Sequence, residues 1–461
     1  MHTGEFILKT TRLVAEGKVG PGWVHVHGES IARVGDGSPS PQGDARIVDL
    51  GDGVLMAGLV DTHVHINAPG RTHWEGFETA TAAAAAGGVT TLVEMPLNSI
   101  PATTSAEALE IKIAEATGKC RVDVGFWGGL VPGNAADLSA LFEAGAWGFK
   151  CFMSPSGVDE FSHVSLEDIE EALPILAALK APLLVHAEWP PALEPWPGGD
   201  PRRHAAWLAC RPPEAEQQAV AHLIALAERF GAHIHVVHVA DQGTVALLRQ
   251  ARARGVAITA ETCPHYLTFC AEEIPDGATA FKCAPPIRQR FHREALWDAL
   301  QAGDLDLIAT DHSPSPPELK CLATGDFSEA WGGIASLQLL LPAVWTQARA
   351  RAVTLPTLSR WLSAAPAALA GLDGRKGRLA PGMDADLVVW DPEASFTVDP
   401  AALAHRHATT PYAGLRLDGV VRATWVRGAC VFDRDPHNPL DGAPPAGQHL
   451  ACGAVLRRGR A

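Results

Sequence analysis

Long apolar runs and an export signal are both missing from this chain. Although 47% of its residues are hydrophobic, no uncharged apolar stretch reaches the roughly 18 residues that a membrane-spanning helix needs. Residues 1–9 contain no basic region followed by an apolar core and a small-residue cleavage site. We therefore expect a globular protein that resides in the cytoplasm and does not interact with membranes.

Paired cysteines and basic blocks are also missing. The nine cysteines are scattered from Cys120 to Cys452 without one Cys-x-x-Cys pair, which argues against a disulfide framework and against a thiolate zinc site. Acidic residues outnumber basic ones by 52 to 37, and the only basic block is Arg457, Arg458 and Arg460. A surface of this sign repels phosphate backbones, so nucleic acid is not an expected partner.

Two patterns of predicted secondary structure alternate along the 461 residues. Short β-type runs separated by turn residues occupy positions 1–53, and similar runs return at 386–390 and 420–426. Between them, helical segments lead into strands: 79–87 into 89–94, 167–180 into 182–186, and 214–231 into 234–238. Repeated units of this kind build a parallel sheet, and at this length the pattern predicts a closed barrel. One β domain made from both chain ends would then flank it.

Candidate metal ligands stand at the ends of the predicted strands. His63 and His65 follow the apolar run 54–61, and alternate residues on a strand point to one face, so both imidazoles can reach one ion. In a chain with 20 histidines that pair alone is as well explained by chance. In a barrel, however, all C-terminal strand ends meet at one mouth. The further candidates with this placement are Lys150, His186, His238 and Asp311.

Lys150 lies in the apolar strand end 148–152, where an ammonium is costly to bury and the pKa falls toward the neutral amine. A neutral amine can take up carbon dioxide, and the resulting carbamate can bridge two metal ions. A snorkelling or salt-bridged lysine is the alternative. Two ions at such a site would activate a water and polarise a carbonyl, while Asp311 could accept and pass on a proton.

These residues resemble a known family, the cyclic amidohydrolases of the amidohydrolase superfamily, over residues 5–435. The superfamily features are residues 61–65, the Lys150 strand, His186, His238, residues 311–314 and the closing segment 377–387. Within the family the chain is most similar to the allantoinase branch. The features of that branch are residues 69–76, 94–98, 101–103, 261–266, 282–288, 316–318 and 331–334.

The resemblance implies an α/β fold with a distorted TIM (β/α)8 barrel, residues 55–372, and a small β-sandwich domain from residues 1–54 and 373–435; a tail, 436–461, follows. It implies two divalent ions, zinc first and iron, cobalt or manganese as alternatives, bridged by N6-carboxylated Lys150. His63 and His65 would bind the more buried ion, and His186 and His238 the more exposed one. Asp311 would be both ligand and catalytic base. A homotetramer is implied as well.

The implied reaction is hydrolysis of the cyclic amide bond of the small molecule allantoin to allantoate. Dihydroorotases carry an arginine where this chain has Asn67, and hydantoinases place a tyrosine shortly after the bridging lysine, whereas residues 152–156 contain none. A hydantoinase or dihydropyrimidinase-like enzyme and a catalytically inactive scaffold are the alternative hypotheses. The predicted substrate-binding residues are Asn98, Arg71, Ser313, Cys283 and Gly332. The Pro- and Trp-rich segment 189–213 is either a wall or lid of the site or a rigid surface loop.

Overall fold

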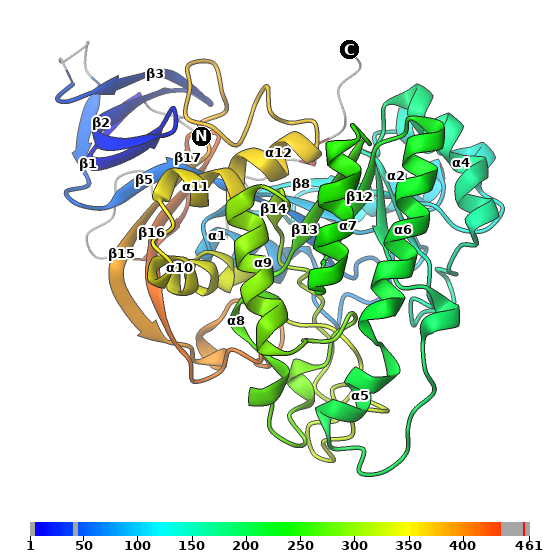
Figure 1. The fold of residues 1–461 in the computed structure, drawn as a ribbon. Coiled ribbons are helices and arrows are strands. Elements are labelled where there is room, and N and C mark those ends of the chain that lie inside the picture. The colour runs from blue at the N-terminus through cyan, green and yellow to red at the C-terminus, as the bar shows by residue number, and fades with distance from the viewer. Residues whose placement is uncertain (1–4, 40–44, 435–454, 457–461) are drawn as a thin grey trace.

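The computed structural model describes residues 5–39, 45–434 and 455–456 (Figure 1). Its strands are β1 Phe6–Ala15, β2 Lys18–His27, β3 Ser30–Asp36, β4 Arg46–Asp49, β5 Val54–Ala57, β6 Leu59–Val64, β7 Val89–Glu94, β8 Asp123–Phe126, β9 Gly128–Gly129, β10 Phe149–Phe152, β11 Leu183–His186, β12 Ile234–Val236, β13 Ile258–Thr262, β14 Leu307–Ile308, β15 Leu387–Thr397, β16 Arg416–Val426 and β17 Ala429–Asp433. The α-helices are α1 Phe77–Ala86, α2 Ala106–Ala116, α3 Leu138–Glu143, α4 Leu166–Leu179, α5 His204–Cys210, α6 Pro213–Phe230, α7 Gln242–Ala253, α8 Pro264–Thr268, α9 Arg290–Ala302, α10 Leu340–Ala350, α11 Leu355–Ser359 and α12 Ala365–Leu369.

The central part of the chain forms the predicted parallel barrel. Strands β6 to β8 pair in sequence order, and β9 to β14 continue in sequence order as a second parallel run. A parallel bridge between Val64 and His312 joins β6 to the segment that follows β14 and so closes the ring. Helices such as α6, α7 and α9 cover the outside (Figure 1). All C-terminal strand ends therefore open on one face, as the sequence pattern indicates.

The two chain ends form one mostly antiparallel sheet beside the barrel, in the order β17-β16-β15-β5-β1-β2-β3, with β4 paired to β1. One face of this sheet carries an apolar cluster that is separate from the barrel core and includes Val24, Leu55, Leu387 and Trp425. Figure 1 places this sheet on the left, with β1 to β3 at its far edge. The α/β fold with a barrel and an antiparallel unit from both termini is thus confirmed.

The apolar run before His63 is two strands rather than one. Residues 54–57 are β5, which pairs with β15 in the terminal sheet, whereas β6 begins at Leu59 in the barrel. Gly58 lies at the change of sheet, and a Cβ at this position would lie 2.2 Å from the Thr90 side chain, so a larger residue would not fit there without a shift. Hydropathy alone hides this switch, since both strands are completely buried.

A buried ionic cluster joins the terminal sheet to the base of the barrel. Lys376 Nζ lies 2.8 Å from an oxygen of Asp123 in β8 and 2.5 Å from one of Asp386, just before β15. Arg427, after β16, also pairs with Asp123. Burial disfavours the Lys376 ammonium, but the three surrounding carboxylates outweigh it and raise its pKa.

Three further features of the sequence can be compared with the structure: membrane-spanning helices, the cysteines and the C-terminal tail. No helix in the described part of the chain is long and apolar enough to cross a membrane. The eight described cysteines are free thiols. The predicted tail lies outside the described residues except for positions 455 and 456, where Leu456 N donates to the Val124 carbonyl at 2.8 Å and its side chain is buried.

Candidate metal centre

The six predicted ligands meet at the open face of the barrel. His63 lies in β6 with His65 just beyond it, Lys150 lies in β10, and His186 ends β11. His238 and Asp311 follow β12 and β14, each with a positive φ, 43° and 47°. Both residues have left-handed backbone conformations, which turn the chain directly at the strand end. This conformation costs free energy in residues other than glycine. All six side chains are buried or nearly so.

One group of ligand atoms is formed by His63, His65 and Asp311. Asp311 Oδ1 lies 3.1 Å from His63 Nε2 and 3.4 Å from His65 Nε2. Burial alone would raise the pKa of Asp311, but the two histidines and His238 outweigh it, so the carboxyl is held ionised with its pKa well below its usual range. The ligand atoms of the three residues lie within 4.8 Å of one another.

A second group is formed by His186 and His238. His186 Nδ1 lies 2.9 Å from His238 Nε2, and the His238 ring is 5.5 Å, centroid to centroid, from that of His63. Burial, together with the neighbouring His186 and Lys150, lowers the pKa of His238. Neutral imidazole is the form that binds metal ions, so the lowered pKa of His238 favours its role as a ligand.

Lys150 is enclosed by this cluster. Its ammonium is completely buried and has no hydrogen-bond partner among the described residues; it faces the Phe152 ring at 4.4 Å from the centroid. Burial lowers its pKa to about 8, although Asp311 and Glu261 act in the opposite direction. A buried lysine without a partner is costly, and the structure does not give Lys150 the salt bridge of the simpler alternative.

The donor set fits divalent ions. Four imidazoles and a carboxylate suit zinc and its first-row neighbours. Lys150, whose charge acts on His65, His186 and His238, is buried with its Nζ atom unsatisfied within the described part of the chain. Among the described residues, His65 Nδ1 and His238 Nδ1 also lack hydrogen-bond partners. All five of these donors, together with Lys150, surround one region at the barrel mouth.

Two carboxylates behind the histidines were not predicted as site residues. Glu261 Oε1 lies 2.6 Å from His63 Nδ1 while its other oxygen reaches His235 Nε2 at 3.1 Å. Glu188 Oε2 lies 2.6 Å from His186 Nε2. Such partners orient a ligating imidazole and fix its tautomer. Sequence position carried a signal for both, because Glu261 lies near the end of β13 and Glu188 two residues after His186.

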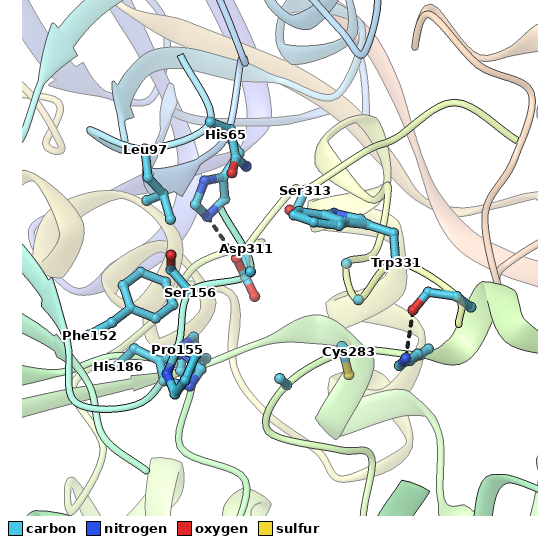
Figure 2. Close-up of a pocket in the computed structure, with 18 of the residues that line it drawn as sticks. His65, Leu97, Phe152, Pro155, Ser156, His186, Cys283, Asp311, Ser313 and Trp331 are labelled. Carbon is cyan, nitrogen blue, oxygen red and sulfur yellow. Dashed lines mark hydrogen bonds and ion pairs between the residues drawn. The ribbon is translucent and has the colours of Figure 1, made fainter. Parts of the chain in front are cut away.

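A cavity of about 230 Å³ lies over the cluster. Figure 2 shows His65, His186 and Asp311 directed toward one another, with Phe152 beside them and Trp331 and Cys283 on the opposite side. Of the predicted substrate-binding residues, Asn98, Ser313, Cys283 and Gly332 line the cavity. Arg71 is not among its lining residues; it donates to the Asn98 carbonyl at 3.0 Å and pairs with Glu160.

Residues 54–431 match the model of the amidohydrolase family. This chain belongs to that family. It is 50% identical to an allantoinase of Streptomyces avermitilis over 428 residues, covering 93% of this chain and 95% of the relative. It is 46% identical to an allantoinase of Arabidopsis thaliana, with 93% and 88% covered. Membership in the family implies a divalent metal centre at the cluster just described.

Solved structures agree on the fold. An L-hydantoinase (dihydropyrimidinase) from Arthrobacter aurescens superposes with a TM-score of 0.90 at 29% identity, over 98% of this chain and 100% of that one. A dihydropyrimidinase from Brevibacillus agri gives 0.88 at 26% identity, with 99% of each chain covered. These amidohydrolase-family members confirm the barrel with its terminal sheet.

No tyrosine reaches the cavity. The chain has two tyrosines, Tyr266 and Tyr412; both are buried and neither is among the lining residues. The Tyr266 hydroxyl donates to the Pro285 carbonyl at 2.6 Å. At the position next to His186 stands Phe152, whose ring stacks on the imidazole at 4.5 Å between centroids. A tyrosine hydroxyl is therefore missing from residues 152–156, as the sequence shows, and also from the rest of the cavity lining.

Proposed function

We propose that this enzyme is an allantoinase, which hydrolyses the cyclic amide bond of allantoin to give allantoate. The observation that carries the proposal is the retention of all six ligand candidates at the mouth of the barrel, in a chain 46–50% identical to allantoinases over most of its length. An inactive scaffold would have no reason to keep an unpaired buried lysine and an ionised aspartate beside four histidines.

His63, His65, His186, His238, Lys150 and Asp311 would hold two divalent ions, zinc first, with Lys150 carboxylated to serve both. Bound there, the ions would supply an activated water and polarise the ring carbonyl. The low pKa that burial imposes on Lys150 supports carboxylation, because only the neutral amine adds carbon dioxide. The carbamate would convert a costly buried cation into an anion among histidines.

Asp311 is the residue we assign to proton transfer. Its Oδ1 faces the two histidines, and its carboxylate projects into the cavity in Figure 2. Oδ2 would accept the proton of the attacking water and deliver it to the departing ring nitrogen. Because the neighbouring histidines hold the pKa of Asp311 below its usual range, the carboxyl is ionised and able to accept a proton.

The substrate ring would be held largely by main-chain groups. Ser313 N already donates to the Ile334 carbonyl at 3.0 Å, so the carbonyl and hydroxyl of Ser313 remain for the ligand. Asn98 lines the cavity, and its buried Oδ1 has no hydrogen-bond partner in the described part of the chain, which suits an acceptor for a ring N–H. Direct substrate contact by Arg71 stays a prediction; its bond to the Asn98 carbonyl supports a role in placing Asn98.

A test of this function is ring opening of racemic allantoin, with hydantoin and dihydroorotate assayed alongside. The protein is stripped with a chelator and reloaded with zinc, with and without bicarbonate. We expect allantoin alone to turn over, and recovery to be faster with bicarbonate because carboxylation of Lys150 requires it. Faster turnover of hydantoin would overturn the substrate, and full metal occupancy without bicarbonate would overturn the carboxylated lysine.

Three further proposals accompany this function. We propose a homotetramer, which light scattering of the full chain tests. We propose the domain division given above, in which the boundary between residues 54 and 55 falls within β5. Limited proteolysis, which cleaves exposed linkers, tests this division. Cytoplasmic residence stays a prediction.

A further inference from the structure

The cavity has a second wall that faces the ligand cluster and that the proposed chemistry does not use. It includes Trp207 and Arg211, from α5 and the residue after it, together with Lys282 and Trp331. The first two belong to the segment 189–213, for which the sequence left a wall and a surface loop equally open. Because both residues line the cavity, part of this segment is a wall of the site.

Arg211 is held at three points. One of its terminal N–H groups donates to Glu188 Oε2, the same oxygen that contacts His186. Its guanidinium lies over the Trp207 ring, 4.8 Å from the centroid. Its own carbonyl accepts a hydrogen bond from Arg288 Nη1 at 3.0 Å. The guanidinium therefore presents a fixed plane to the cavity, with 16% of the side chain exposed.

Trp207 connects this arginine to the place where the substrate ring is expected. The indole Nε1 donates to the Cys283 carbonyl at 2.8 Å, and Cys283 lines the cavity next to Gly332. The same indole thus sets the Cys283 main chain and supports the Arg211 guanidinium. A ligand that touches one of these groups lies close to the other.

Lys282, the other cation of this wall, already has partners. Its ammonium donates to the Ala330 carbonyl at 2.6 Å and to that of Ser328 at 3.4 Å, and it lies 4.4 Å from the centroid of the Trp207 ring. Arg211 differs, because the described part of the chain provides an acceptor for only one of its five N–H groups. Arg211 therefore keeps four N–H groups for a ligand, whereas Lys282 keeps one.

We propose that Arg211 is a specificity-determining residue that binds the ureido arm of the substrate. This inference rests on the proposed function. The ring carbonyl that reacts must lie at the ligand cluster, and the ureido arm stands on the neighbouring ring carbon, so the arm lies in the same cavity, which Arg211 lines. A ureido group ends in a carbonyl oxygen, which accepts hydrogen bonds from the free guanidinium N–H groups, and hydrogen bonds to a charged partner are among the stronger ones.

The test compares allantoin, which has the ureido arm, with hydantoin, which has the ring alone. Arg211→Lys keeps a cation beside Glu188 but loses the planar fork. We expect kcat/KM for allantoin to fall about 10–100-fold, while the inhibition constant of hydantoin against allantoin stays within about twofold. Metal content is measured alongside. Arg203→Lys, an exposed arginine one residue before α5, is the matched control and should match the parent enzyme.

An equal loss for both ureides, or lowered metal content, would assign Arg211 to the support of His186 through Glu188 and overturn the proposal. Unchanged allantoin kinetics would overturn it too. If the parent enzyme does not open allantoin, the proposed function fails separately. Calorimetric binding of the two ureides to metal-loaded protein then decides on Arg211, since only a lost preference for allantoin in the lysine variant supports the assignment.

Discussion

The two sides of the cavity are built in different ways. The ligand side consists of residues in or directly after the barrel strands β6, β10, β11, β12 and β14. The opposite wall consists of Trp207 in the short helix α5, Arg211 directly after it, and loop residues from 282–284 and 329–333, which come together from separate parts of the chain. Strand ends are placed by the barrel itself, whereas the wall depends on how loops contact one another.

The two sides are also stabilised by opposite charges. Behind the ligand histidines stand buried carboxylates, Glu261 and Glu188, each within 2.6 Å of an imidazole nitrogen. Behind the wall stand buried ammonium groups that donate to loop carbonyls. Lys320 is the clearest, with bonds of 3.3, 2.9 and 2.8 Å to the carbonyls of Lys282, Trp331 and Gly333. The comparison suggests that chemistry depends on the carboxylates and substrate affinity on the lysines.

The largest effect is expected on the ligand side, from Asp311→Asn. The amide preserves the shape of the side chain but cannot carry the proton, so we expect turnover of allantoin to fall by about 10²–10⁴-fold while part of the metal is retained. Steady-state kinetics with metal analysis on the same sample measures both. Parent-like rates in a metal-loaded variant would contradict the role of Asp311.

A smaller effect is expected from Glu261→Gln. Without the carboxylate the His63 ring loses its charged partner, and metal affinity should fall about 10–100-fold, as measured by zinc titration against a competing chelator. Glu75→Gln is the matched control. Glu75 is also completely buried beside a histidine, His312, at 3.3 Å, but that histidine is not a predicted ligand. Equal losses in the two variants would show a general stability effect instead.

The smallest effect on catalysis is expected from Lys320→Met, which should weaken substrate binding and leave the metal site unchanged. Three hydrogen bonds to loop carbonyls disappear, so we expect a loss of about 2–4 kcal/mol in the free energy of unfolding and a several-fold rise in KM. Turnover number and metal content should not change. Denaturant unfolding and kinetics measure these, with the partly exposed Lys119→Met as control. A lowered metal content would erase the distinction between the two sides.

The elements with a strong local pattern were predictable. The helix expected at 167–180 is α4, Leu166–Leu179, and the strand expected at 89–94 is β7. Their apolar spacing and turn signals are local properties, which can be identified directly from the sequence. The division of 54–61 between two sheets was missed, because residues 54–57 pair with β15, a strand more than 300 positions away, and both halves of the run are equally apolar.

The candidate site divides in the same way. Its metal-ligand types were predictable from histidine alternation, a lysine in an apolar strand and the conserved geometry of barrel strand ends, and the structure brings those residues together. Trp207 and Arg211 were not predicted as site residues. Trp207 donates to the Cys283 carbonyl, 76 positions away, and Arg211 donates to Glu188, 23 positions away, and no local pattern marks such partners.

By itself, the sequence determined the class of fold, the barrel strands and the side chains that can hold metal ions, because strand periodicity places each of these locally. Only the tertiary structure decided which polar groups remain without partners. Within residues 5–39, 45–434 and 455–456, Lys150 has no acceptor and Lys282 has two carbonyls, although both lysines are buried. Burial and hydrogen bonding depend on every neighbour in space, so the chemistry of a buried group is settled only when the whole chain is folded.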